Sequence, residues 1–374
     1  MIESYFDRKG ENVRRRIILH PQKKTIDLPL LLTVVILVLF GLTFVYDVSA
    51  IQAFRDFGDS AYYIKNQLIW VIIGIASAYF FTYFDYQKLR KISAPLFILS
   101  IIALLAVFIP GLGTRSGGAQ RWLNLSFFSV QPIEILKLTS VIFFATQFDK
   151  KLNLKLLLLV IFAASFIVGF LQRDLGSTIV FVTTSLLIYI IAGGSLWQFA
   201  ISVPILLGAL IILVITSEYR RKRIFAFLDP SSDPQGYTYH IYQILVSLGS
   251  GGIFGLGLGQ SRQKFYIPEV TTDSIFAIIG EELGIVGGIL ILSLFAYFVI
   301  RGFKIAANAQ DNFGKILASG ITSWIGIQAI INLGAMVSLF PLTGVPLPFI
   351  SYGGSALVAN LTAVGILLNI SKRK

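Results

Sequence analysis

Apolar stretches of about twenty residues recur along the whole chain, and this repetition limits the fold more than any other feature. Hydrophobic residues make up 55% of the 374 residues and charged residues only 13%, whereas a soluble protein carries roughly a quarter charged residues. Such stretches are typical of transmembrane helices. We predict an all-α polytopic membrane protein with ten transmembrane helices. Their approximate positions are 28–47, 64–84, 93–110, 132–148, 154–172, 176–192, 196–216, 274–300, 315–335 and 352–370.

The distribution of Lys and Arg predicts the orientation of these helices. Residues 1–26 are rich in basic residues and contain no apolar stretch, so we expect a cytoplasmic basic tail followed by a single ten-helix domain over 27–374. The turns 85–91 and 149–153, the loop 301–314 and the end of the chain are also basic. Because basic loops stay on the cytoplasmic side, both termini are predicted to be cytoplasmic.

A long polar segment, about 218–273, separates the seventh and eighth predicted helices. It contains acids, bases and aromatic residues, and six glycines lie between Gly249 and Gly259. Irregular backbone cannot face lipid, because its N–H and C=O groups would have no hydrogen-bond partners. We therefore predict a large extracytoplasmic loop. Loops held by a rigid scaffold are where functional residues concentrate.

A run of cations from Arg220 to Arg223 begins this loop, on the side of the membrane that should be poor in positive charge. Long loops are translocated largely regardless of charge, so the run can be a solvated flank. Alternatively, the outer site needs cations because its substrate is anionic. A diphosphate is a good candidate, since Arg and Lys bind phosphate oxygens. The sequence leaves both interpretations open.

Composition disfavours several classes of site. The chain has no cysteine and only two histidines, His20 and His240, so thiolate ligands are absent and a His-rich metal centre is not expected. The net charge of +12 does not indicate a nucleic-acid partner, because basic residues in so apolar a chain set topology or contact anionic membrane lipid. The glycine cluster lacks the strand–turn–helix context of a dinucleotide site.

Ionisable residues within or beside predicted spans are costly and often functional. Glu134 and Lys137 share one face of the fourth helix, where they either form a structural ion pair or neutralise a ligand. Arg173 and Asp174 lie in the turn before the sixth helix, where they either have a functional role or belong to an ordinary polar turn. Glu281 belongs to an acidic pair in the eighth helix, and this pair either has a functional role or forms a local cap or ion pair.

Two further outer loops carry unusual patterns. Residues 111–131 contain a glycine-rich turn that presents Arg121 beside Trp122, a cation and an interfacial ring at headgroup depth. Membrane anchoring by an aromatic residue would explain Trp122 alone. Residues 341–355 contain three prolines and a pair of glycines, which indicates a re-entrant or gating element.

Together these motifs resemble the SEDS family, named for shape, elongation, division and sporulation. The resemblance runs from the first predicted helix to the last and rests on long strings in the family's order. These are DP at 229–230, DPQGY at 233–237, GSGGIFGLGLGQSRQK at 249–264, IPEVTTDSIFAIIGEELG at 267–284 and PLTGVPLPFISYGGS at 341–355, with QRW at 120–122, QPIEILK at 131–137 and RDLG at 173–176. The strings GLGLGQSRQK and IPE are most similar to the division branch.

The resemblance implies a peptidoglycan glycosyltransferase of the bacterial cytoplasmic membrane. Family members polymerise lipid II on the outer face of that membrane, in cell division or elongation, and release undecaprenyl diphosphate. The essential catalytic aspartate of the family's PE-x-x-x-D string corresponds to Asp273. The resemblance also implies a class B penicillin-binding protein, a transpeptidase, as partner, with other divisome or elongasome proteins.

The chain departs from the usual family pattern at a few positions. Thr271 and Ser274 stand where the family often has His and Phe. Arg173 replaces the usual proline, and Ile133 replaces a serine. None of these changes removes an ionisable residue that the chemistry needs, but those near Asp273 and Asp174 are expected to affect loop packing and substrate fit.

The residues and the resemblance agree on one mechanism. The lipid tail needs a membrane groove, the diphosphate needs cations, and the acceptor hydroxyl needs a base, for which we predict Asp273. A single displacement at the anomeric carbon inverts its configuration. The predicted substrate-binding residues are Arg121, Trp122, Glu134, Lys137, Arg173, Asp174, Arg262, Lys264, Glu269 and Glu281. The sequence leaves open a divalent cation, magnesium or manganese, between Asp273 and the diphosphate.

Two other functions stay open from the sequence. A lipid II flippase is one, because intramembrane charges and a re-entrant-looking stretch are also typical of transporters. Against it, the charged motifs cluster outside and no inverted halves are visible. The other is a non-catalytic scaffold that recruits a transpeptidase.

Overall fold

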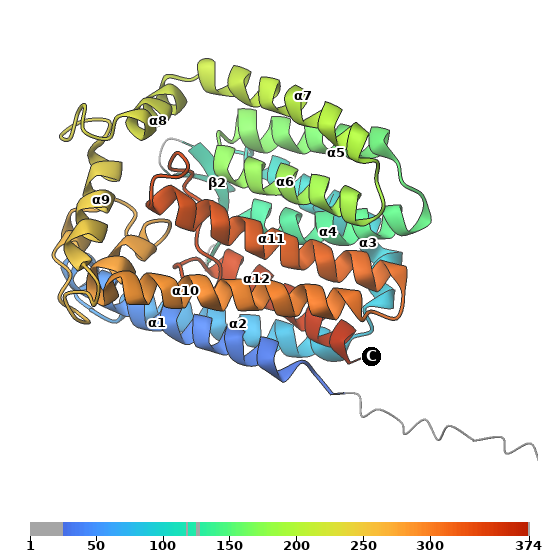
Figure 1. The fold of residues 1–374 in the computed structure, drawn as a ribbon, viewed down its shortest axis with the longest axis horizontal. Helices are drawn as coiled ribbons and strands as arrows, with labels where there is room; N and C mark the ends of the chain where they lie inside the picture. The colour runs from blue at the N-terminus through green and yellow to red at the C-terminus, as the bar shows by residue number, and fades with distance from the viewer. Residues whose placement is uncertain (1–24, 117–118, 125–127, 373–374) are drawn as a thin grey trace, which may run out of the picture.

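The computed structural model of the protein describes residues 25–116, 119–124 and 128–372, which form a bundle of long helices with a small sheet (Figure 1). The long helices and their extensions are α1 (Leu28–Phe57), α2 (Tyr62–Tyr83), α3 (Gln87–Ala106), α4 (Pro132–Lys150), α5 (Leu154–Ser165) with the π-helix η1 (Phe166–Leu171), α6 (Leu175–Ile191), α7 (Leu196–Ile215), α10 (Ile275–Ala307), α11 (Asn312–Met336) and α12 (Gly354–Ser371). The other elements are β1 (Gly113–Ser116), β2 (Ala119–Asn124), β3 (Ser129–Val130), α8 (Glu218–Leu228), α9 (Tyr239–Gly251) and the 3₁₀ helix η2 (Gln263–Phe265). The predicted basic tail lies, apart from its last two residues, outside the described residues.

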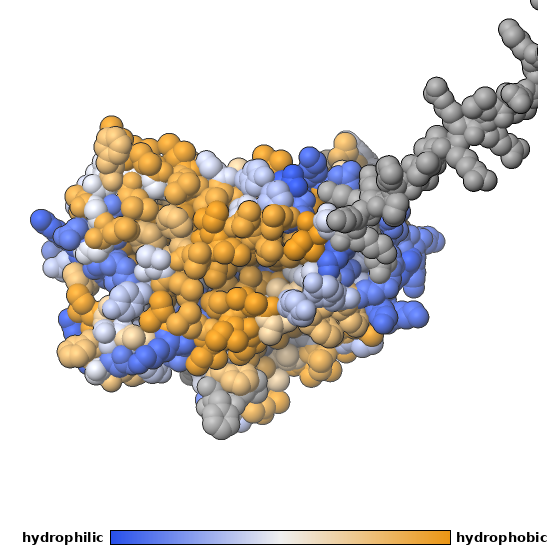
Figure 2. Space-filling model, turned by 90° about the horizontal axis from the view of Figure 1, so that it is seen from below, coloured by the Kyte–Doolittle hydropathy of each residue, from blue (hydrophilic) through white to orange (hydrophobic). Residues whose placement is uncertain are grey.

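A helix lies at each of the ten predicted apolar stretches. In the described part of the chain, eight helices are long and apolar enough to cross a membrane. The exceptions are α6, which has only 17 residues, and α4, which carries Glu134, Lys137, Asp149 and Lys150. On the face shown in Figure 2, hydrophobic residues form a broad middle band with hydrophilic residues towards both ends. A multi-pass, mainly helical membrane protein is therefore confirmed, and the number of ten spans stays a prediction.

Helices α4, α11 and α12 form the centre of the bundle, and nearly all their side chains are buried. Helix α12 packs most extensively against α2, while α11 packs against α10, α6 and α4. Glycines allow these close approaches: a Cβ on Gly365 of α12 would lie 2.4 Å from the carbonyl oxygen of Ala78 in α2. Helix α7, by contrast, has few buried residues and lies at the edge of the bundle (Figure 1).

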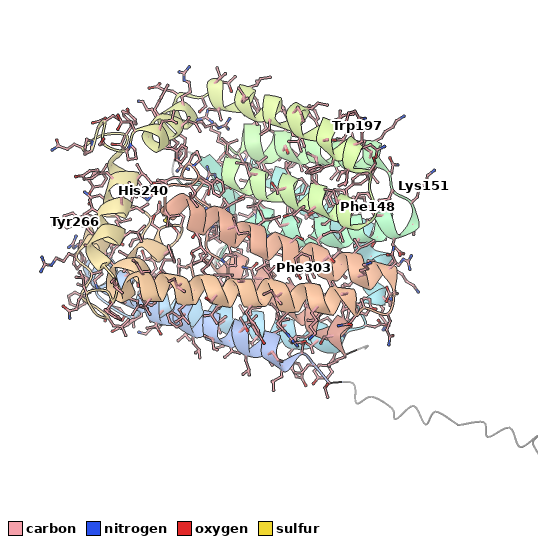
Figure 3. All side chains as sticks on the ribbon, in the orientation of Figure 1. Phe148, Lys151, Trp197, His240, Tyr266 and Phe303 are labelled. Carbon is pink, nitrogen blue, oxygen red and sulfur yellow. The ribbon has the colours of Figure 1, made fainter. Side chains whose placement is uncertain are left out.

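Polar contacts join the helices at the end of the bundle where both ends of the described chain lie (Figure 1). Arg301 of α10 contacts Asp27, the N-cap of α1, at 2.5 Å, and Arg90 of α3 pairs with Asp149 of α4. The opposite end carries α8 and α9. Figure 3 shows His240 at that end and Lys151 at the first.

The predicted outer loops contain more regular structure than the sequence indicated. Residues 111–131 hold an antiparallel sheet of order β1-β2-β3, in which Thr114 pairs with Trp122. Residues 218–273 contain α8, α9 and η2. These elements are short, and short helices and strands depend on contacts with distant residues, so the local pattern did not reveal them. The prediction of an all-α protein is corrected to a mainly helical one with a small sheet.

Helix α10 is interrupted where the glycine-rich segment crosses it. Gly284 adopts φ 65° and ψ −162°, which breaks the helical backbone. Backbone groups freed by the break bond to residues 252–257 instead; for example, the N–H of Ile285 donates to the carbonyl of Gly252 at 3.0 Å. A Cβ on Gly255 would lie 2.1 Å from the carbonyl oxygen of Glu282. The glycines therefore let this segment lie directly against the α10 backbone.

Candidate active site

Asp273 lies two residues before α10, and contacts with other segments fix its position. Asn332 of α11 donates from Nδ2 to the backbone carbonyl of Asp273 and to that of Val345, both at 2.8 Å. The Thr272 hydroxyl lies 3.2 Å from Asp273 Oδ1. Asp273 is only 6% exposed, so its carboxylate occupies a buried and defined position.

Burial raises the pKa of the Asp273 carboxyl above its ordinary value of 3.8, because the charged form loses hydration. The Arg223 guanidinium, the Thr272 hydrogen bond and Arg121 act in the opposite direction. A carboxylate with a raised pKa accepts a proton more readily near neutral pH. The environment of Asp273 thus suits a general base.

Four arginines line a cavity of about 420 Å³, which we call the arginine cavity. Arg121 comes from β2, Arg173 from the turn before α6, and Arg220 and Arg223 from α8. Arg223 Nη1 and Asp273 Oδ2 each lie 3.8 Å from the position that a Cβ on Gly344 would take. Arg223, on the wall of the arginine cavity, and the Asp273 carboxylate therefore both approach Gly344, where a larger side chain would contact both groups.

No carboxylate neutralises these four arginines among the ion pairs of the described residues. Backbone carbonyls hold three of them instead: Arg220 donates to Gly169 at 2.5 Å, Arg223 to Leu342 at 3.0 Å and Arg121 to Arg173 at 2.8 Å. Burial, and then the neighbouring Arg173 and Arg121 cations, lower the pKa of Arg220. Clustered cations without acids repel one another, so an anion would stabilise the arginine cavity.

The apolar part of the arginine cavity leads towards the space between α6 and α7. Ile179 and Thr183 of α6 line the arginine cavity and also a second, almost wholly apolar cavity of about 260 Å³. Phe199 and Leu206 of α7 form the far wall of that second cavity. A ligand with a charged head and a hydrocarbon tail would match this arrangement.

His240 of α9 lies on the other side of Arg223. Its Nε2 is 2.8 Å from the Ser274 hydroxyl, and the two residues Arg223 and His240 line a cavity of about 250 Å³. Burial, and then the Arg223 charge, lower the pKa of His240 to about 4. His240 is therefore neutral at neutral pH and supports Ser274, the residue after Asp273, by a hydrogen bond.

The structure brings together Asp273, Arg121 and Arg173 from the predicted site, and it places Glu134 and Lys137 elsewhere. Lys137 Nζ lies 2.8 Å from Glu134 Oε1 and 2.7 Å from Gln328 Oε1, and both charged residues are at most 2% exposed. Neither residue lines the arginine cavity. This arrangement matches the structural ion pair that the sequence left as an alternative.

We expect Lys137→Ala to lower the free energy of unfolding by about 3–5 kcal/mol, because it leaves the Glu134 charge buried and unpaired. Thermal or denaturant unfolding of the purified protein in detergent would measure this loss. The double variant Glu134→Gln/Lys137→Met serves as the control, since it removes both charges and should recover most of the stability. A single variant as stable as the unmodified protein would contradict the assignment.

Three other predicted residues hold local structure. Asp174 caps α6 by accepting from the Ser177 N–H at 3.0 Å. Glu281 accepts from the Ser261 hydroxyl at 2.6 Å, which fastens the end of the glycine-rich segment to α10. Lys264 pairs with Asp47 of α1 at 2.9 Å. These contacts support the site's framework, and any direct contact with substrate stays a prediction.

The remaining predicted residues lie nearer the surface. Arg262 and Glu269 are exposed, and Trp122 on β2 is partly buried. The predicted list omitted Arg220 and Arg223, although the charge pattern had singled out their run. Gly344 and His240 were also missed, because only the folded chain brings Gly344 to Asp273 and His240 to Ser274. Thr272 was missed although it directly precedes Asp273, because only the structure shows its hydrogen bonds to two carboxylates.

A divalent cation has few protein ligands here. Among the described residues, no group of three or more His, Cys, Asp or Glu side chains could hold a metal ion. Asp273 offers one carboxylate, the charges that act on it are those of Arg223 and Arg121, and the neighbouring Glu269 carboxylate is connected to it only through Thr272. A cation at Asp273 would therefore need oxygen atoms of a substrate to complete its coordination.

Comparisons with known sequences agree with these features. A family model described as "Cell cycle protein", for FtsW, RodA and SpoVE, matches residues 28–374. The chain is 42% identical over 353 residues to a probable peptidoglycan glycosyltransferase FtsW of Trichlorobacter lovleyi, covering 92% of this chain and 93% of the relative. It is 41% identical to the stage V sporulation protein E of Bacillus subtilis, covering 94% of this chain and 98% of the relative.

Solved structures show the same fold. One chain, from work on the coordination of polymerization and crosslinking by a peptidoglycan synthase complex, matches with a TM-score of 0.76 and 25% identity, covering 92% of this chain and 97% of that one. The rod shape determining protein RodA of Thermus thermophilus matches with a TM-score of 0.68 and 24% identity, covering 92% and 96%.

Proposed function

The chain belongs to the SEDS family of cell cycle proteins, and we propose that it is a peptidoglycan glycosyltransferase that polymerises lipid II. The observation that carries this proposal is the meeting of Asp273 and Arg223 at Gly344, beside a cavity with four arginines and apolar walls. Lipid II offers the matching parts: a sugar, a diphosphate and a long hydrocarbon tail. The relatives named as probable peptidoglycan glycosyltransferases FtsW support the same activity.

In the proposed reaction, Asp273 takes the proton of the acceptor hydroxyl as that oxygen attacks the anomeric carbon of the donor sugar. The bond from this carbon to the diphosphate breaks, and configuration inverts. Arg121, Arg173, Arg220 and Arg223 stabilise the charge that develops on the leaving diphosphate. The prenyl tail lies in the apolar cavity between α6 and α7.

The same reasoning suggests how the protein sits in the cell. We propose that it spans the bacterial cytoplasmic membrane with both termini in the cytoplasm, as its basic turns predict. The end of the bundle with α8, α9 and Asp273 then faces outward, where the substrate is polymerised. A class B penicillin-binding protein is the proposed crosslinking partner, supported by the match to a chain of a peptidoglycan synthase complex.

Purified full-length protein in detergent, with and without its transpeptidase partner, should convert lipid II into glycan strands. Detergent removes the need for flipping, so polymerisation there separates an enzyme from a lipid II flippase. A non-catalytic scaffold would also give no glycan under either condition. Electrophoresis of the labelled product measures the strands. Failure to form glycan with the partner present would refute the proposed activity.

A further inference from the structure

Thr272 lies between two carboxylates. Its Oγ1 is 3.2 Å from Asp273 Oδ1 and 3.3 Å from Glu269 Oε2, and 3.1 Å from the backbone carbonyl of Glu269. One hydroxyl has one proton to donate and can accept another, so Thr272 can hydrogen-bond to both carboxyl groups at once when one of them is protonated. It forms a continuous polar connection between a buried acid and an exposed one.

Glu269 opens onto water. It is exposed and lines a polar cavity of about 550 Å³ between the end of α1, the start of α2 and residues 264–271. Arg55, Asp56 and Tyr63 also line this cavity, which we call the polar cavity. The backbone of Glu269 has φ 51°, a left-handed conformation that is unfavourable for a residue other than glycine. The turn thus holds a glutamate at a position where glycine would be less strained.

The two carboxylate oxygens of Asp273 therefore face different surroundings. Oδ2 faces Gly344 and Arg223 at the arginine cavity, while Oδ1 faces Thr272 and, through it, the polar cavity. A general base that gains a proton in every transfer must lose it before the next one. Because Asp273 is buried and the proposed substrate fills the arginine cavity, the Thr272 side offers the connection to solvent.

We propose that Thr272 and Glu269 form a proton relay that returns Asp273 to its ionised form after each sugar transfer. The proposal rests on the role of Asp273 as general base. After the acceptor oxygen has bonded to the anomeric carbon and the diphosphate has left, a half-turn about Cβ–Cγ brings the protonated oxygen of Asp273 to Thr272. Asp273 gives this proton to Thr272 Oγ1, the Thr272 hydroxyl gives its own to Glu269 Oε2, and Glu269 releases it to water.

The surrounding charges favour this direction. Arg223 and Arg121 act on Asp273 and stabilise its ionised form. On the outer side, Glu269 acts electrostatically on Tyr63 of α2 and on His240 of α9, which is neutral at neutral pH. The cations at the arginine cavity therefore offset part of the effect of burial, which holds the proton on Asp273, and the exposed carboxylate accepts the proton. Thr272 and Glu269 act through Asp273 and are positioning residues for proton transfer.

The test compares Thr272→Val with Thr271→Val in the full-length protein and its transpeptidase partner, with lipid II as substrate. We expect Thr272→Val to lower kcat for polymerisation about tenfold, with KM unchanged and a larger solvent deuterium isotope effect. Thr271 lines the polar cavity without a side-chain link to Asp273, so Thr271→Val should match the unmodified protein. Glu269→Gln should resemble Thr272→Val, because an amide cannot accept the proton.

Two rescues separate a relay from a structural role. Thr272→Ser keeps the hydroxyl and should restore kcat, and a high concentration of imidazole buffer should speed up Thr272→Val by carrying the proton. The relay is wrong if Thr272→Val behaves like Thr271→Val, or if its loss of rate responds to neither rescue. An active Asp273→Asn variant would instead overturn the assigned base, whatever the result at Thr272.

Discussion

Asp273→Asn is expected to lower the rate of glycan polymerisation by about 10²–10⁴-fold, the usual contribution of a positioned general base. Asparagine keeps the size of the side chain but cannot take the proton of the acceptor hydroxyl. Asn332 bonds to the backbone carbonyl of residue 273, so the local fold should persist. Initial rates of lipid II polymerisation by the purified variant, with its transpeptidase partner, measure the loss.

Asp229→Asn is the matched control for this variant. Asp229 lies in the same segment between α7 and α10, is exposed, and accepts a hydrogen bond from the Ser231 N–H that asparagine can also accept. It should keep full activity and the same expression level. Polymerisation by Asp273→Asn at the rate of Asp229→Asn would rule out Asp273 as the base.

The raised pKa of Asp273 also predicts the acid limb of the pH–rate profile. The ionised carboxylate is the active form, so the rate falls as the pH drops through the pKa of Asp273. Because burial raises that pKa, the fall should occur above the ordinary value of 3.8 rather than around it. A profile of kcat/KM against pH for the free enzyme tests this, and a flat profile down to pH 4 would contradict it.

The helices could be predicted from sequence because their signal is local. Each apolar stretch carries its own evidence of length and hydrophobicity, so α1 and α12 were placed within a few residues at the N-terminal end of each. The sheet β1–β3 gave no such signal, since its strands are short and exist through pairing. Asp273 was assigned by resemblance to a sequence motif. Such a motif identifies the residue but not the side chains that surround it in the fold.

The partners of each charged group could not be predicted in this way. Lys137 lies within an apolar stretch and Arg223 ends a run of cations, yet it is Lys137 that is paired with a buried carboxylate, while Arg223 is paired with a carbonyl. The packing of α4 against α11 encloses Lys137 in a structural ion pair. The packing of α8 against the 340–345 segment instead leaves the Arg223 guanidinium on a backbone carbonyl, without an acid partner. The predicted site included Lys137 through the family resemblance and left out Arg223, whereas the contacts place Lys137 in a buried ion pair and Arg223 on the wall of the arginine cavity.

Arg223→Gln is expected to lower kcat for polymerisation by about 10²–10³-fold, the usual loss when one preorganised donor to a developing charge is removed. Arg223 is the arginine that approaches Asp273 at Gly344, so in the proposed reaction it lies where charge would grow on the leaving diphosphate. Arg223→Lys should recover only part of the rate, because an ammonium group cannot replace the planar fork of a guanidinium. Steady-state polymerisation rates of the two variants measure these effects.

Arg221→Gln is the control that separates the effect of where Arg223 lies from the effect of its charge alone. Arg221 is the exposed neighbour of Arg220 on α8 and does not line the arginine cavity, so its loss lowers the net charge of the segment equally. If the run of cations acted only as a diffuse positive field, Arg221→Gln and Arg223→Gln would lower the rate by similar amounts, and added salt would reduce both effects. A large loss at Arg223 alone is expected, because a partly buried cation without an acid partner acts on the charge directly in front of it, whereas a solvated one is screened.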